Sequence, residues 1–217
     1  MVYNADHHTP EDGRIQADTE WPGAGEGRCY SMRKIAVVFP GIGYTKDRPL
    51  LYYSGKQAVK CGYELRHIEF HGLVWDKEKL KDRSFMQSTL ERCLGMTEEQ
   101  LADLGDISSD RVVFISKSMG TVVATAYDKS RSIGAEHLCF SPLEMIEPYI
   151  GEERGILFYG DSDPYADFRA IERIADEKRL EKIRIAGGNH SLETGEPCKD
   201  IDNLKGMIQR VAEEIPE

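Results

Sequence analysis

A serine, a histidine and an aspartate in this sequence are of the types that cooperate in nucleophilic catalysis. A serine hydroxyl is a poor nucleophile at neutral pH until a neighbouring base takes its proton. His190 could take the proton of Ser118 and later return it to a leaving group. Asp163 could accept the other ring N–H of His190, select its tautomer and stabilise the imidazolium. Together the three residues predict acyl transfer through a covalent intermediate on Ser118.

The segment around Ser118 has the small residues that a tight strand-to-helix turn requires. An apolar run at 111–116 precedes it, and a helical pattern follows it. Strand and helix nearly touch at such a turn, so the positions two before and two after the nucleophile must be small. Ser116 and Gly120 meet this need, although glycine is usual at the first position. Ser116 itself is a poor nucleophile candidate, because bulky Phe114 stands two residues before it. The alternative role for Ser118 is that of a helix N-cap.

Candidates for the acid and the base follow two later apolar runs. Asp161 and Asp163 come after the run 155–159, and His190 comes after the run 181–186. Ligands and catalytic groups gather at the carboxyl ends of strands in open α/β sheets. Asp163 is favoured over Asp161 because it lies farther along its loop and has the better reach. Either aspartate could instead cap a helix or form a turn, and His190 could be a loop histidine without a role.

At these residues the chain resembles the α/β-hydrolase superfamily, in which a serine, an acid and a histidine occur in this order. The resemblance covers about residues 33–213. It implies that Asp163 is the acid, because it follows a strand-ending glycine by three positions. It also implies that His190 acts from the short glycine-containing loop before the last helix.

The resemblance further implies an oxyanion hole, because a tetrahedral intermediate needs at least two donors for its negative oxygen. One backbone N–H is expected from Met119, directly after the nucleophile. The other is expected from the loop 39–45, with Ile42 as first choice and Gly43 as second. The family often carries His-Gly in this loop, where this chain has Pro-Gly. The loop lacks the glycines of a dinucleotide fingerprint and the Gly-Lys-Ser/Thr of a P-loop.

Short apolar runs alternate with amphipathic stretches from residue 34 onward, a pattern typical of a parallel sheet covered by helices on both faces. We expect an α/β class fold, a three-layer α/β/α sandwich with a mostly parallel sheet of about six buried strands, as in the α/β hydrolases. The expected strands are 34–39, 63–70, 111–116, 136–141, 155–159 and 181–186. The expected helices are 49–61, 84–94, 97–104, 119–129, 166–178 and 201–213.

Two local signals refine the expected helices. Thr97 and Gln100 predict a capping box at the start of one helix. In the last helix, apolar residues at helical spacing are expected to face the sheet. These residues are Ile201, Leu204, Ile208 and Val211.

The gap between residues 141 and 154 bears on the substrate. It is too short for the helical cap that many members of the superfamily insert there. The site is therefore expected to be open and to suit small soluble esters or thioesters. Side chains expected to border it are Tyr44, His71, Leu143, Met145 and Tyr165. The aromatic and methionine positions among them could equally be ordinary core. Lys117, Lys46 and Arg48 could favour an anionic substrate, although isolated cations are usually just solvated.

Composition limits the classes of partner. The formal net charge of −10 argues against nucleic acid, and no apolar run reaches membrane-spanning length. The five cysteines are widely spaced, which indicates free thiols in a reducing cytoplasm. No histidine has the spacing of a metal site, so we expect no metal and no cofactor. The oligomeric state stays open.

Residues 1–31 show neither helical nor strand periodicity, so we expect an irregular N-terminal arm followed by an α/β-hydrolase domain at 32–217. Met32 could serve as an alternative translation start. The sequence thus predicts a cytoplasmic serine hydrolase acting on a small acyl substrate. The alternative is a non-catalytic protein of the same fold that binds a small ligand or a protein partner.

Overall fold

Six strands form a single sheet in this computed structural model, which describes residues 32–73, 79 and 82–215. The expected arm at 1–31 lies outside the described residues. The strands are β1 (Lys34–Phe39), β2 (Glu64–His67), β3 (Arg111–Lys117), β4 (Glu136–Phe140), β5 (Gly155–Gly160) and β6 (Glu181–Ile185). Their order is β2-β1-β3-β4-β5-β6, and each neighbouring pair is parallel, which confirms the expected fold class.

The carboxyl ends of the strands meet along one edge of the sheet. Phe39 of β1 lies opposite Ser116 of β3, and Lys117 of β3 lies opposite Phe140 of β4. The connections after β1, β3, β5 and β6 therefore leave the sheet side by side, although they are far apart in the sequence.

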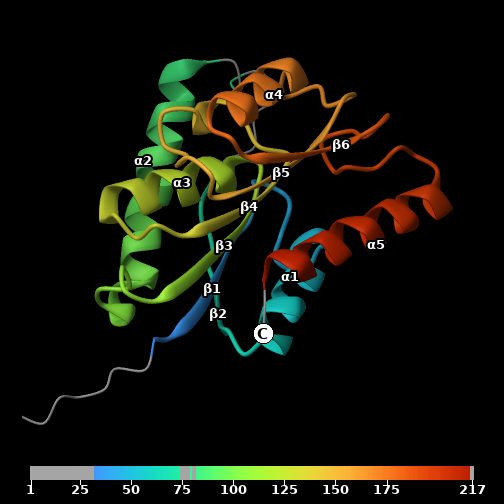
Figure 1. The fold of residues 1–217 in the computed structure, drawn as a ribbon. Coiled ribbons are helices and arrows are strands. Elements are labelled where there is room, and N and C mark those ends of the chain that lie inside the picture. The colour runs from blue at the N-terminus through green and yellow to red at the C-terminus, as the bar shows by residue number, and fades with distance from the viewer. Residues whose placement is uncertain (1–31, 74–78, 80–81, 216–217) are drawn as a thin grey trace, which may run out of the picture. The chain divides into compact units, whose positions relative to one another are not determined.

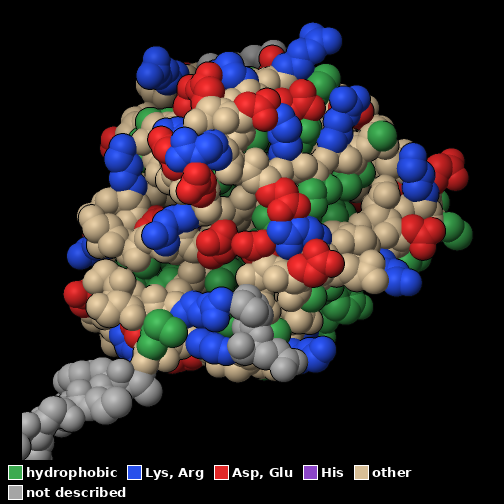
Figure 2. Space-filling model, in the orientation of Figure 1, with side chains coloured by type: hydrophobic (Ala, Val, Ile, Leu, Met, Phe, Trp, Pro, Cys, Tyr) green, Lys and Arg blue, Asp and Glu red, His purple; other side chains and the backbone are tan. Residues whose placement is uncertain are grey.

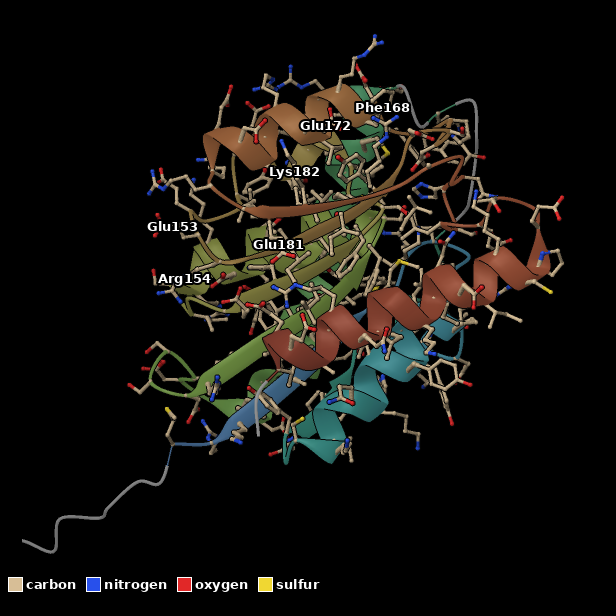
Figure 3. All side chains as sticks on the ribbon, turned by 45° about the vertical axis from the view of Figure 1, so that its right-hand side comes forward. Glu153, Arg154, Phe168, Glu172, Glu181 and Lys182 are labelled. Atoms are coloured by element: carbon tan, nitrogen blue, oxygen red, sulfur yellow. The ribbon has the colours of Figure 1, made fainter. Side chains whose placement is uncertain are left out.

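Of the helices in the described residues, two cover one face of the sheet and three cover the other (Figure 1). The first face is covered by α1 (Pro49–Lys60) and α5 (Pro197–Glu214), which lie side by side in Figures 1 and 3. The second face is covered by α2 (Arg83–Gln100), α3 (Met119–Arg131) and α4 (Phe168–Glu177). Because both faces are covered, the apolar runs of the central strands are buried almost completely.

The two edge strands differ from the expectation that all six strands are buried. Both β2 and β6 carry exposed, charged residues. On β6, Glu181 accepts from Arg210 of α5 at 2.7 Å, and its neighbour Lys182 pairs with Asp176 of α4 (Figure 3). Successive strand residues point to opposite faces, so each charge reaches a different helix layer. Charged side chains of this kind also protect an open sheet edge from pairing with another chain.

The helix boundaries correct two further expectations. One continuous helix, α2, replaces the expected helices 84–94 and 97–104. The predicted capping box was therefore wrong, because Thr97 is buried inside the helix, where its hydroxyl donates to the Cys93 carbonyl. A short 3-10 turn, η2 (Ala102–Leu104), follows α2. In α5, Ile201 is 65% exposed, because the first turns extend beyond the end of the sheet (Figure 1). Val211 is buried as expected, and Met207, which was not expected, is buried beside it.

The surface mixes both signs of charge. Acidic and basic side chains are interspersed over the face shown in Figure 2. Among the helices in the described ranges, none combines the length and apolar character that a membrane span needs.

Candidate active site

Ser118 occupies a strained position between β3 and α3. Its φ of 54° and ψ of −123° lie in a region that residues with a side chain rarely adopt, at a cost of about 1–3 kcal/mol. The Ser118 N–H donates to the Phe140 carbonyl at 3.0 Å, which holds the turn against β4. Ser118 stands at the N-cap position of α3, but its side chain makes no capping hydrogen bond, so its hydroxyl does not have the capping role that was the alternative.

The turn is tight enough to require small residues on both sides of Ser118. A Cβ at Gly120 would lie 2.4 Å from the Phe39 oxygen and 2.5 Å from the Pro40 oxygen, distances that no side chain tolerates. Ser116 is completely buried, with its hydroxyl 3.4 Å from the Leu138 carbonyl. It therefore cannot meet a substrate, whereas Ser118 lines a cavity.

Three side chains form a hydrogen-bonded chain that ends on Ser118. The Nε2 of His190 lies 2.8 Å from Ser118 Oγ, and its Nδ1 lies 2.7 Å from Asp163 Oδ2. The other oxygen of Asp163 accepts from the Tyr165 N–H at 2.8 Å. A carboxylate can only accept, so Nδ1 donates to it. Nε2 is thereby left free to accept the proton of Ser118.

Asp161, the rival acid, has a different task. It pairs with Arg184 at 2.8 Å and accepts from the Gly187 N–H at 2.6 Å. These bonds tie the loop after β5 to the end of β6, and they keep the pKa of Asp161 below its usual value. Of the two aspartates, the structure brings only Asp163 to His190.

The loops that carry Asp163 and His190 are in direct contact. A Cβ at Gly160 would lie 2.0 Å from the Gly188 oxygen, so only glycine fits there. The Ser162 N–H donates to that same oxygen at 3.0 Å. This contact sets the distance between the acid and the base.

Burial shapes the proton affinity of His190. Its side chain is 17% exposed, and loss of hydration is the largest influence lowering its pKa below the usual 6.5. The hydrogen bond that His190 donates to Asp163 acts in the opposite direction, and the charge of Lys117 lowers the pKa further. The Tyr165 ring packs edge-on against the imidazole, with centroids 5.0 Å apart. The imidazole is therefore neutral at pH 7 and able to act as a base.

The expected oxyanion donors divide into two groups. Ile42 and Met119 line the same cavity as Ser118 and His190. Gly43, the second choice, borders a neighbouring groove instead and supplies the positive φ of 81° in the turn that Gly41 and Tyr44 close. Ile42 borders that groove as well, so of the two expected loop residues it is the one that lies beside both the cavity and the groove.

The cavity beside Ser118 has a volume of about 90 Å³. Leu143, Met145 and Tyr165 line it as expected, and the connection 141–154 holds only the short 3-10 turn η3 (Glu144–Ile146), with no cap. Met86 and Glu144 also line it, and sequence reasoning missed both. Met86 belongs to the apolar face of α2 and looked like ordinary core.

The other expected border residues lie elsewhere. The Tyr44 hydroxyl accepts from the Leu50 N–H at 3.3 Å, and its ring lies under the ammonium of Lys117. The His71 side chain is 79% exposed and borders the groove of Gly43. Lys117, considered for anionic substrates, is fully buried, so it cannot meet one.

A protein metal site needs several ligating side chains close together. Within the described ranges, no three or more His, Cys, Asp or Glu side chains are grouped as a metal ion would require.

Comparisons by sequence found no match: no protein-family model and no curated protein sequence resembles the chain. Solved structures do. A lidless α/β serine hydrolase from Xanthomonas campestris matches with a TM-score of 0.56 at 14% identity, over 85% of this chain and 83% of that one. Est1E from Butyrivibrio proteoclasticus, with ferulic acid bound, matches with a TM-score of 0.57 at 11% identity, over 83% of this chain and 90% of that one. An α/β serine hydrolase homologue from Coxiella burnetii matches with a TM-score of 0.52 at 12% identity, over 83% and 87% of the two chains.

Proposed function

We propose that this chain, which has the α/β-hydrolase fold, is a serine hydrolase that cleaves a small carboxylic ester or thioester through an acyl-Ser118 intermediate. The observation that carries the proposal is the hydrogen-bonded chain from Asp163 through His190 to the strained Ser118, beside an apolar cavity. A protein that only binds a ligand has no need of a base aimed at a serine hydroxyl.

The first half of the reaction forms the acyl-enzyme. Ser118 Oγ attacks the carbonyl carbon of the substrate while Nε2 of His190 takes its proton. The resulting oxyanion accepts hydrogen bonds from the backbone N–H groups of Ile42 and Met119, each worth about 3–4 kcal/mol in the transition state. Collapse of the intermediate breaks the bond to the alcohol or thiol, which leaves with the proton from Nε2.

The second half releases the acid. His190 takes a proton from water, and the hydroxide oxygen attacks the acyl carbon. The second tetrahedral intermediate uses the same two N–H groups. Its collapse returns the proton to Ser118 Oγ and frees the carboxylic acid. Asp163 stays ionised throughout and stabilises the imidazolium of His190.

The cavity favours a short, uncharged acyl group. Its volume of about 90 Å³ holds only a few heavy atoms, and its walls are mostly apolar. Glu144, an acidic residue, also borders it, which opposes an anionic acyl group. No cap covers the approach from the connection 141–154. A small-molecule acyl substrate, no nucleic-acid or membrane partner, and a cytoplasmic location remain predictions from the sequence.

The test is labelling with a fluorophosphonate probe, followed by mapping of the modified residue and measurement of p-nitrophenyl acetate hydrolysis. Wild-type protein should be labelled at Ser118, and Ser118→Ala should lose both labelling and hydrolysis. Ser116→Ala is the matched control, because Ser116 is buried two residues away, and it should keep both. An unlabelled, inactive wild-type protein would favour the non-catalytic binding protein.

A further inference from the structure

Lys117 is a fully buried lysine next to the proposed nucleophile. It is the last residue of β3, so its side chain points to the opposite face of the sheet from that of Ser116 before it. Its ammonium donates to the backbone carbonyl of His190 at 2.6 Å. Lysine is almost never completely buried without a partner of opposite charge. In the described part of the chain, however, the hydrogen-bond partner of this ammonium is a neutral carbonyl.

The surroundings of Lys117 come from four different segments. The ring of Tyr44, after β1, lies 5.2 Å from the ammonium. The Ser141 hydroxyl, after β4, donates to the same His190 carbonyl at 2.9 Å. Asp163, after β5, is the charged group that acts on the ammonium, and it is itself the hydrogen-bond partner of His190. Lys117 therefore contacts the backbone of the base and acts electrostatically on its acid.

Stability alone does not account for a lysine here. Removing an ammonium from water costs several kcal/mol, and an apolar side chain of similar volume usually stabilises such a place as well or better. A stabilising contribution is therefore a weak explanation for a lysine at this position, and its contacts in the site offer a better one.

We infer that Lys117 is a positioning residue for the proposed hydrolysis: it anchors the backbone of His190 and places a positive charge beside the Asp163 and His190 pair. The anchor, shared with Ser141, keeps the imidazole aimed at Ser118. The charge opposes premature protonation of His190. This inference rests on the proposed function.

The sign of the electrostatic effect follows from the groups around His190. Asp163 and Lys117 act on it directly, and Glu144 borders the same cavity. Burial lowers the pKa of Lys117 to about 7, so Lys117 is charged in the acidic range where His190 titrates. That charge lowers the pKa of His190, so removing it should raise the pKa.

The experiment compares Lys117→Met with Ser141→Ala. Both remove a donor to the His190 carbonyl, but only the first removes a charge. Lys117→Met should lower kcat by roughly 10- to 100-fold with little change in KM, because the base is misplaced. It should also move the acid limb of kcat/KM to higher pH. Ser141→Ala should lower kcat by about 5-fold, the loss of one neutral hydrogen bond, and leave the acid limb in place.

The outcomes separate this inference from the proposed function. A wild-type protein without labelling at Ser118 would overturn the proposed function. A labelled wild type whose Lys117→Met variant keeps its kcat and its acid limb would overturn only the role of Lys117. If Lys117→Met fails to fold, Lys117→Gln, which keeps a donor without the charge, must still move the acid limb. An unchanged kcat in Ser141→Ala would overturn the backbone anchor.

Discussion

Replacing Asp163 by asparagine should move the ring proton of neutral His190 from Nδ1 to Nε2. In the native chain, Asp163 accepts from the Tyr165 N–H at 2.8 Å and from Nδ1 of His190 at 2.7 Å. The N–H of Tyr165 can only donate, so the amide oxygen of an asparagine stays on that side and its NH₂ group turns toward His190. Nδ1 must then accept, and the proton moves to Nε2. There it faces Ser118, and the imidazole can no longer act as a base.

The expected loss is about 10⁴-fold in kcat, as the same substitution costs in the serine-protease template. This corresponds to about 5.5 kcal/mol of transition-state stabilisation. KM should change little, because Asp163 does not line the cavity. The assay is p-nitrophenyl acetate hydrolysis over a range of substrate concentrations, with thermal melting to show that the variant is folded.

Asp161→Asn is the matched control. The new amide can keep the hydrogen bond from the Gly187 N–H, and it loses the charge and the two hydrogen bonds from Arg184, whose side chain is 49% exposed. Such a partly exposed pair is worth about 1 kcal/mol or less, so the rate should fall by no more than a few-fold. If Asp161→Asn were crippling and Asp163→Asn mild, Asp161 would be the acid and the reasoning on tautomers would be refuted.

Three further predictions follow from the turn, the base and the cavity. Gly120→Ala should lower the free energy of unfolding by about 3 kcal/mol, because the new Cβ would meet backbone oxygens 2.4 and 2.5 Å away. Gly95→Ala is the control, because Gly95 has open space around it in α2, and it should leave the stability unchanged or raise it. Differential scanning calorimetry measures both effects. Burial keeps the pKa of His190 below 6.5 and the base must be unprotonated, so kcat/KM should be maximal by neutral pH and fall as the pH drops through that lower value; an acid limb centred above 6.5 would contradict this. Leu143→Ala should enlarge the cavity and shift the preference among p-nitrophenyl esters from acetyl toward longer acyl chains, and an unchanged preference would place the acyl group elsewhere.

The central elements and the candidate site residues could be predicted because their signals are local. The apolar runs of β1, β3, β4 and β5 mark strands buried on both faces, and Ser116 and Gly120 mark a tight turn around Ser118. Parallel strands bring their carboxyl ends to one edge whatever their order, which is why Asp163 and His190 could be expected on the same edge as Ser118. The pairing of β5 with β6, which brings the loops of Asp163 and His190 together, is seen only in the structure.

Burial of the remaining side chains depended on contacts between distant segments, which no local pattern contains. The sequence shows Lys117 as a cation beside a serine, and only the packing of the loops after β1, β4, β5 and β6 makes it a buried partner of the His190 carbonyl. His71 resembles a site residue in sequence, yet it is an exposed residue of the segment that follows edge strand β2. Met86 resembles core, yet α2 brings it to the cavity. The sequence by itself determined which residues can perform the chemistry, and the tertiary structure decided which side chains surround them, because burial is set by the elements that cover each face.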